Sequence, residues 1–178
     1  MASARARDHS ARGESAWLTP NICTFTTWQA QLASELSLSL SSDALAGQVP
    51  INAHQSLLIW QSIIDHDVFV GEPQVAQLAL AAWRMIHEHS LDQPQHWPEL
   101  MLSEDTRQFV DWANKYQAAC RARNVVDEWV VAAMLPAAIT NGSITPPPRI
   151  ELHGFDLPLT PLQNDILQAC TATGCAVE

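Results

Sequence analysis

The chain has 178 residues and a net charge of −10, and 47% of its residues are apolar while 16% are charged. This balance is typical of a globular protein with one hydrophobic core and excludes an intrinsically disordered chain. Nineteen acidic residues against nine basic ones argue against autonomous binding to a nucleic-acid backbone, because such binding depends on Lys and Arg.

The N-terminal part is predicted to contain two segments. Residues 1–15 are rich in Ala, Arg and Ser, which favours a flexible terminus or the tail of a helix, and they lack the apolar core of a signal peptide. Residues 16–38 are predicted as a strand–helix segment. Within it, residues 22–25 favour a strand, and Thr26 or Thr27 is a suitable cap for a helix over residues 28–38.

Residues 39–141 are predicted as a run of helices joined by loops. A Ser-rich stretch with Gly and Pro predicts a loop over residues 39–50. Asn52 is a good N-cap for a helix over residues 53–65, and Pro73 suits the first turn of the next helix. That next helix should run to about residue 89, with a buried stripe of Val75, Leu78, Ala79, Ala82 and Ile86.

Two further helices complete this run. Ser103 followed by two acidic residues is a clear helix start. Helical spacing then continues through a stripe of apolar and aromatic residues: Phe109, Trp112, Ala113, Tyr116 and Cys120. The last helix is predicted over residues 127–139, where Pro136 should bend or shorten it.

Residues 149–178 are predicted as strand–helix–strand. A strand over residues 149–155 ends at a glycine turn, and Thr160-Pro161-Leu162-Gln163 is a capping box with proline in the first turn. Residues 175–177 open another strand. The fold class is therefore mainly α with a small parallel sheet (α/β), in one compact unit. A chain that stops on a starting strand is expected to come from a longer one, with uncovered edges that favour self-association.

Common catalytic motifs are missing from the sequence. It contains no GxxxxGK[ST], HExxH, GxSxG or CxxC pattern. His87 and His89 are two positions apart, so on a helix they point roughly 200° away from each other, and we expect solvent-facing histidines rather than a metal site. No metal and no cofactor are predicted.

The aromatic and sulfur residues favour structural roles. Trp112 and Tyr116 could stack on bases, but they lie on the predicted buried stripe, which favours core packing. Four scattered cysteines do not form a disulfide framework and favour a reduced, cytoplasmic setting. Cys170 is predicted as a core thiol and Cys175 as a loop thiol.

Several segments, in order, resemble AddB-like proteins, which are inactivated superfamily I (UvrD-like) helicases regarded as probable DNA-repair proteins. The segments are AWLTPNI at residues 16–22 followed by Trp28, PINAHQSLLIWQSII at 50–64, residues 109–116 followed by Val126-Asp127, and GFD at 154–156 followed by TPLQ at 160–163. The signature residues are Trp17, Thr19, Pro20 and Trp28 near the N-terminus and Gly154, Phe155, Asp156, Thr160, Pro161 and Gln163 near the C-terminus.

This resemblance implies part of a RecA-like (P-loop NTPase-like) domain with a helical insertion. Family members are several times longer and carry a phosphate-loop-like turn and a PD-(D/E)xK nuclease, neither of which is in this sequence. Where active relatives hold the Walker B acids, this sequence has His153-Gly154-Phe155, and Asp156 falls into the turn. The resemblance therefore implies no catalytic residue here. Its partners would be the rest of a helicase–nuclease, with DNA contacted only indirectly and no membrane.

Three functional hypotheses follow. The first is a non-catalytic scaffold in a DNA-repair helicase–nuclease. The second is a stand-alone acidic helical adaptor that uses some of its seven tryptophans as exposed anchors. The third is a small metal- or thiol-dependent enzyme built on His87 with His89, or on Cys170 with Cys175.

Overall fold

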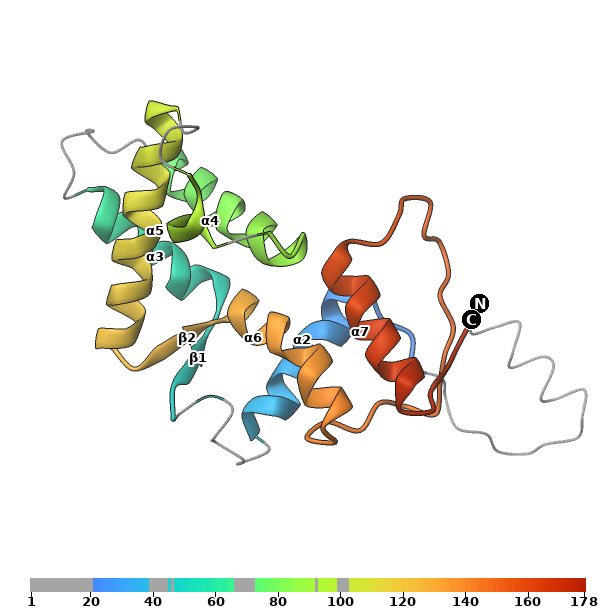
Figure 1. Cartoon of the computed structure of the whole chain (residues 1–178). Helices are drawn as coiled ribbons and strands as arrows, with labels where there is room; N and C mark the ends of the chain where they lie inside the picture. The colour runs from blue at the N-terminus through green and yellow to red at the C-terminus, as the bar shows by residue number, and fades with distance from the viewer. Residues whose placement is uncertain (1–20, 39–44, 46, 66–72, 92, 99–102) are drawn as a thin grey trace, which may run out of the picture.

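A computed structural model of the protein describes residues 21–38, 45, 47–65, 73–91, 93–98 and 103–178 (Figure 1). The predictions for residues 1–15, Trp17, Thr19 and Pro20 lie outside these residues. The described part is mainly helical, as predicted. Its helices are α2 (Phe25–Leu38), α3 (Ala53–Ile64), α4 (Pro73–Glu88), η1 (Pro94–His96), α5 (Glu104–Ala122), α6 (Glu128–Thr140) and α7 (Pro161–Ala172). Its strands are β1 (Val49–Ile51), β2 (Val125–Asp127), β3 (Arg149–Ile150) and β4 (Ala176–Val177).

The described strands form two separate two-stranded sheets, both parallel. Strand β1 pairs with β2, and Ile51 lies opposite Asp127. Strand β3 pairs with β4, and Arg149 lies opposite Ala176. The parallel arrangement was predicted for β3 and β4, but the prediction of a single sheet is wrong. Strand β1 was missed, because residues 39–50 were predicted as a loop. A three-residue strand that contains a proline has too short a pattern to be recognised in the sequence.

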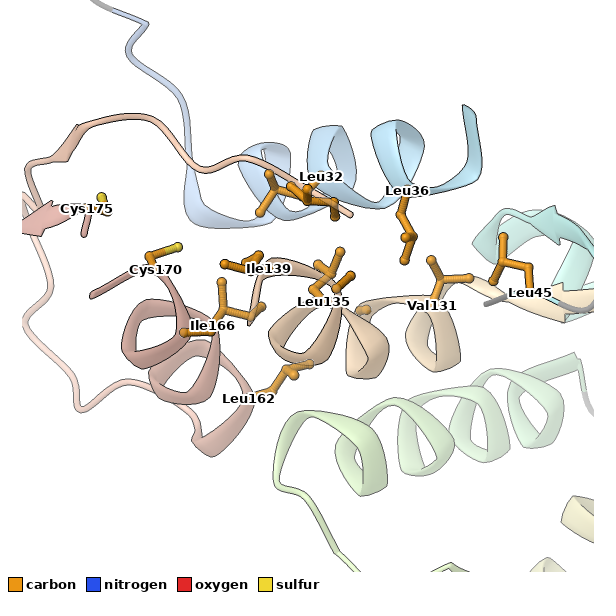
Figure 2. Close-up of a cluster of buried hydrophobic side chains, with 14 of the residues drawn as sticks. Leu32, Leu36, Leu45, Val131, Leu135, Ile139, Leu162, Ile166, Cys170 and Cys175 are labelled. Atoms are coloured by element: carbon orange, nitrogen blue, oxygen red, sulfur yellow. The ribbon is translucent and has the colours of Figure 1, made fainter. Parts of the chain in front are cut away.

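Two hydrophobic cores share the described helices. The α6–α7 core lies between α2, α6 and α7 and is centred on Leu135 and Ile166, neither of which is exposed (Figure 2). The tryptophan core lies between α3, α4 and α5 and is centred on Trp60 and Trp83. Val130 of α6 packs against both, so α6 joins them (Figure 1). Although α6 lies within residues 39–141, most of its buried residues belong to the core that contains α2 and α7.

Helix α6 continues through Pro136 instead of stopping there. Five of its residues are buried, among them Leu135 at 0% exposure. Proline removes one backbone hydrogen bond from a helix interior, at a cost of about 3 kcal/mol. Burial of several large apolar side chains, each contributing roughly 1.5–3 kcal/mol, outweighs that cost. Of the two predicted effects of Pro136, bending or shortening, the shortening does not occur, because α6 runs to Thr140.

Most predicted helix starts are confirmed, and one is corrected. Asn52 caps α3, Ser103 caps α5 and Thr160 caps α7. Helix α2 begins at Phe25, because the Oγ1 of Thr24 accepts a hydrogen bond from the Thr27 amide at 3.1 Å. The strand predicted over residues 22–25 is therefore wrong, since these residues lead into the helix.

The buried stripe of α4 is also shifted from its prediction. Ala76, Ala79, Trp83 and Ile86 are buried, whereas Leu78 is 68% exposed. Two neighbouring faces of α4 are apolar, and contact with α3 and α6 decides which of them is buried. Elsewhere, no helix in the described residues is long and apolar enough to cross a membrane.

Truncation of Leu135 tests the importance of the α6–α7 core. Because its side chain is fully buried, Leu135→Ala should lower the free energy of unfolding by about 2–5 kcal/mol. The matched control is Leu157→Ala, since Leu157 is 80% exposed and its loss should change stability by less than about 0.5 kcal/mol. Urea unfolding followed by circular dichroism measures both, and equal effects would contradict this account of the core.

Candidate functional site

The two parallel strands β1 and β2 bring two helix N-termini together. Strand β1 ends at Ile51 and α3 begins at Ala53, while β2 ends at Asp127 and α6 begins at Glu128. Since Ile51 and Asp127 lie opposite each other in the sheet, both helices begin at the same edge. The N-terminus of a helix carries unpaired amide groups and a partial positive charge. This edge therefore attracts anionic groups.

Asp127 fills this place and is only 2% exposed. Its Oδ1 accepts a hydrogen bond from the Trp129 amide at 2.7 Å, which caps α6. Its Oδ2 accepts hydrogen bonds from the Ser56 hydroxyl at 2.9 Å and from the Tyr116 hydroxyl at 2.5 Å. These donors belong to α3, α5 and α6, so one carboxylate binds three helices. We call Ser56, Tyr116, Asp127 and Trp129 the Asp127 network.

A second carboxylate lies beside the first. The Ala53 amide at the start of α3 donates a hydrogen bond to Glu128, which lowers the Glu128 pKa. Burial of Glu128 and the nearby charge of Asp127 are larger effects, so the net result is a raised pKa. Each helix N-terminus is thus matched with a side chain of the protein itself.

This geometry has a direct chemical consequence. In α/β proteins, anionic ligands bind outside the carboxyl ends of parallel strands, at helix N-termini. Here Asp127 takes that position and is almost completely buried. A phosphate group would have to displace a carboxylate that already accepts three hydrogen bonds. The β1–β2 edge is therefore a structural junction and not an anion-binding site.

Aromatic side chains enclose the Asp127 network on the side of the tryptophan core. The ring of Trp60 stacks on that of Tyr116, with centroids 4.5 Å apart, and Trp83 meets Tyr116 edge to face at 5.7 Å. Burial, followed by the charge of Asp127, raises the pKa of the Tyr116 hydroxyl far above its ordinary value. Tyr116 therefore stays protonated and acts as a permanent hydrogen-bond donor.

His87 lies in the same core, contrary to the prediction that it faces solvent. It is 8% exposed, and its ring meets Trp83 edge to face at 4.7 Å. Its buried Nε2 has no hydrogen-bond partner among the described residues. Burial lowers the His87 pKa, while the charge of Asp127 partly opposes that shift. Because His89 is exposed, the two histidines do not converge, and the described residues hold no group of three potential metal ligands.

The C-terminal signature residues lie elsewhere, beyond strand β3. This strand ends at Ile150, so the predicted strand over residues 149–155 is too long. Gly154 has a φ of +75°, which explains the glycine in this turn. Asp156 is exposed and lies in the segment between β3 and α7. Thr160 and Gln163 form the predicted capping box of α7, with Pro161 in its first turn.

Aromatic contacts join this turn to α2. The ring of Phe25 lies edge-on to Phe155, with centroids 6.4 Å apart, and edge-on to Trp28 at 5.4 Å. Trp28 and Phe155, from the two ends of the sequence resemblance, therefore contact the same side chain. Phe155 remains 44% exposed, so this is a surface packing contact.

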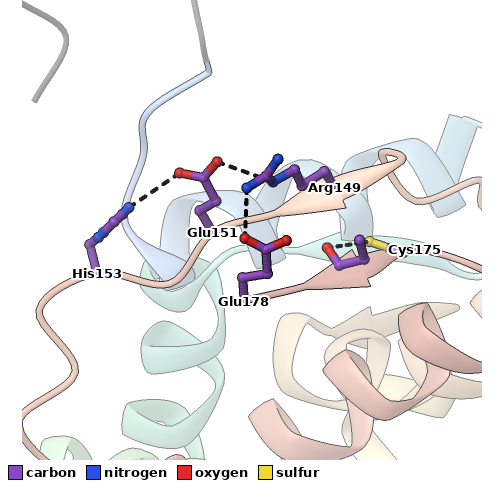
Figure 3. Close-up of polar contacts among 6 residues, drawn as sticks. Arg149, Glu151, His153, Cys175 and Glu178 are labelled. Carbon is purple, nitrogen blue, oxygen red and sulfur yellow. Dashed lines mark hydrogen bonds and ion pairs between the residues drawn. The ribbon is translucent and has the colours of Figure 1, made fainter. Parts of the chain in front are cut away.

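A polar cluster lies on the surface of strands β3 and β4 (Figure 3). Arg149 contacts Glu178 at 2.6 Å and Glu151 at 3.2 Å, and Glu151 contacts His153 at 3.4 Å. Arg149, His153 and Glu178 are each more than half exposed. Ion pairs in such positions contribute at most about 1 kcal/mol to stability. The Arg149–Glu178 ion pair joins the two strands.

Cys170 and Cys175 are free cysteines at the C-terminal end of α7. The Cys175 amide donates to the Cys170 carbonyl at 3.0 Å, and the Gly174 amide donates to the Thr171 carbonyl, which is a Schellman motif. Cys170 is a core thiol and Cys175 lies in the loop before β4, as predicted, and both side chains are buried. Burial raises the pKa of Cys170 to about 11. Such a thiol is a poor nucleophile at neutral pH, which argues against a thiol enzyme here.

Comparison of the chain with protein-family models, with curated proteins and with solved structures found no match.

The central role of Asp127 was not predicted from the sequence. A helix was predicted to begin at residue 127, but the capping role of Asp127 was not predicted. The two hydroxyl donors are 71 and 11 residues away in the sequence. Ser56 lies next to apolar residues on α3, and this position in the sequence was the one hint that its hydroxyl would be buried.

Removal of the Asp127 carboxylate should destabilise the protein strongly. Asp127→Ala leaves the Ser56 and Tyr116 hydroxyls buried without their acceptor, and we expect a loss of about 3 kcal/mol in the free energy of unfolding. Asp127→Asn keeps an acceptor for the Trp129 amide and should lose less. Urea unfolding measures both, with the exposed Asp156→Ala as the control. A loss below about 1 kcal/mol for Asp127→Ala would refute the central role of this carboxylate.

His87 should make stability depend on pH. Since burial lowers its pKa below the ordinary value of 6.5, the unfolded chain binds more protons near that pH than the folded one. The contribution of His87 is therefore complete above pH 6.5 and is lost as the pH falls towards its folded pKa. In urea unfolding between pH 7.5 and 5, His87→Phe should lose less stability on acidification than the wild type. Parallel pH profiles would show that His87 is not responsible.

Proposed function

We propose that the chain is a non-catalytic part of an AddB/UvrD-like DNA-repair helicase–nuclease, acting in the cytoplasm as a scaffold beside the DNA path. In this proposal, α2, β3, α7 and β4 belong to a partial RecA-like domain, and residues 39–141 form its helical insertion. The partners are the remaining parts of the helicase–nuclease. DNA is contacted only indirectly, in keeping with the net charge of −10.

The convergence of separate sequence segments supports this proposal most. Ser56 and Trp60 come from the segment at residues 50–64, Tyr116 from residues 109–116, and Asp127 from the pair after it. These four residues form one buried unit of hydrogen bonds and stacked rings. Segments that resemble one family in sequence order thus also meet in space, as expected if they preserve one packing arrangement.

The positions of the acidic groups support a non-catalytic role. Phosphoryl transfer requires acidic residues at a strand end to hold Mg²⁺ and to orient water. Strand β3 is followed by Glu151, which pairs with Arg149 and His153. Asp156 is exposed in the turn beyond. At the other sheet, Asp127 is engaged by its three hydrogen-bond donors and is inaccessible to substrate.

The adaptor hypothesis is the second candidate, and surface leucines favour it. Leu157 is 80% exposed and Leu38 is 76% exposed, which suits contact with a partner. The tryptophans do not serve this purpose in the described part of the chain, where none of the six is exposed. An adaptor would therefore bind its partner through aliphatic side chains and not, as first expected, through tryptophans.

Genetic complementation separates these functions. Deletion of the coding sequence should lower survival after treatment with an agent that breaks both DNA strands, by at least about tenfold if repair is blocked. Asp156→Ala should restore survival fully, because the scaffold needs no carboxylate there. Asp127→Ala should restore it only in part, because the fold is weakened and less folded protein is present. Immunoblotting must show Asp156→Ala at the wild-type level.

Two outcomes would overturn the proposal. Normal survival of the deletion strain would remove the link to DNA repair and favour the adaptor. Failure of a well-expressed Asp156→Ala variant would make this carboxylate catalytic. In parallel, purified protein should hydrolyse ATP at the background rate with and without DNA, and the same rate is expected for Asp156→Ala.

A further inference from the structure

The outward face of α4 carries an apolar stripe that the described residues leave uncovered. Leu78 is 68% exposed and Met85 is 55% exposed, although both lie inside the helix. Ala81 is exposed and Ala82 is partly buried between them. The spacing 78, 81, 82 and 85 places these side chains in one row along the helix. We call these four residues the α4 stripe.

We propose that the α4 stripe is a contact between two copies of this chain, paired through antiparallel α4 helices about a two-fold axis. With the axis between Ala81 and Ala82, Leu78 of one copy lies opposite Met85 of the other. Each Ala81 lies opposite Ala82 of the second copy. A two-fold contact requires a surface that is complementary to itself. The stripe meets this requirement, since both large side chains are at its ends and both small ones are in its centre.

The small central residues determine how closely the helices can approach. Helix axes pack 8–10 Å apart depending on the side chains between them, and alanines favour the lower value. At that distance, Leu78 of one copy and Met85 of the other copy can cover each other. Met85 is unbranched and adapts to an uneven neighbour. Gln74 and His89, both exposed, lie opposite each other at the ends and form a polar rim.

The charged side chains next to the α4 stripe point away from it. Arg84 contacts Glu88 at 2.8 Å, and its guanidinium lies 4.7 Å above the Trp129 ring. These contacts hold the Arg84 side chain towards α6 and away from the stripe. Two copies therefore meet through apolar contact, without burying an unpaired charge.

The size of the contact determines its strength. One pair of four-turn helices buries on the order of several hundred Å², below the roughly 1,200–2,000 Å² of stable specific interfaces. Each copy also carries a net charge of −10, which opposes association until salt screens it. The pairing is thus a weak and reversible dimer, with a dissociation constant on the order of 100 µM, and it strengthens with salt.

Analytical ultracentrifugation of the full chain tests this inference. From about 10 µM to 1 mM protein in 0.5 M NaCl, the weight-average mass should rise from the 19.6 kDa of one chain towards twice that value. Association should be weaker in 0.05 M NaCl. Leu78→Glu should raise the dissociation constant at least about tenfold, because the two-fold axis places the new charge in the contact twice. The control is Leu157→Glu, which adds the same charge at an exposed site outside the α4 stripe and should leave association unchanged.

A cross-link tests the geometry independently. In a Cys23→Ser background, which removes the exposed native thiol, Ala81→Cys should form a covalent dimer under mild oxidation. Gln77→Cys, on the flank of the same helix, should cross-link at least several-fold more slowly. A constant monomer mass up to 1 mM, association that persists in Leu78→Glu, or equal cross-linking of both cysteines would each overturn the proposal. None of these results bears on DNA repair, so the proposed function stands or falls separately.

Discussion

The buried carboxylate of Asp127 is the interaction on which the rest of the structure depends. It accepts hydrogen bonds from Ser56, Tyr116 and the amide of Trp129, and so fixes α3, α5 and α6 to one another. A carboxylate is costly to bury unless hydrogen bonds replace its water. Here three donors and the positive ends of two helices replace it. The same requirement makes the junction specific, because no neighbouring register of β1 and β2 would bring these donors together.

Helix α6 transmits this constraint to the rest of the molecule. Its first turn is fixed by the Asp127 network, and its buried residues continue into the α6–α7 core, where Leu135 and Ile166 are fully enclosed. Val130 packs against both cores. Such a helix is apolar on nearly all sides, which is typical of a central helix. Its proline is tolerated because packing on both sides compensates for the missing hydrogen bond.

The same junction explains why, in this chain, side chains and not a ligand occupy the helix N-termini that follow a parallel strand pair. The architecture produces a positive edge where α/β proteins hold phosphate, and Asp127 and Glu128 neutralise it from within. Stability and ligand binding compete for the same amide groups. In this protein they serve stability, which agrees with the proposed scaffold role. The α4 stripe lies on a different surface, where the described residues leave it uncovered.

The sequence by itself determined the elements whose signals are local. Asn52, Ser103 and Thr160 identified three helix starts, since a cap depends on the next three residues. The buried face of α5 was also predicted correctly, because the apolar residues of this helix lie on a single face. Tertiary structure alone decided the burial of His87, the exposure of Leu78 and the pairing of β1 with β2. These depend on contacts between residues far apart in the chain, and strands of two or three residues carry too short a pattern to reveal their partners.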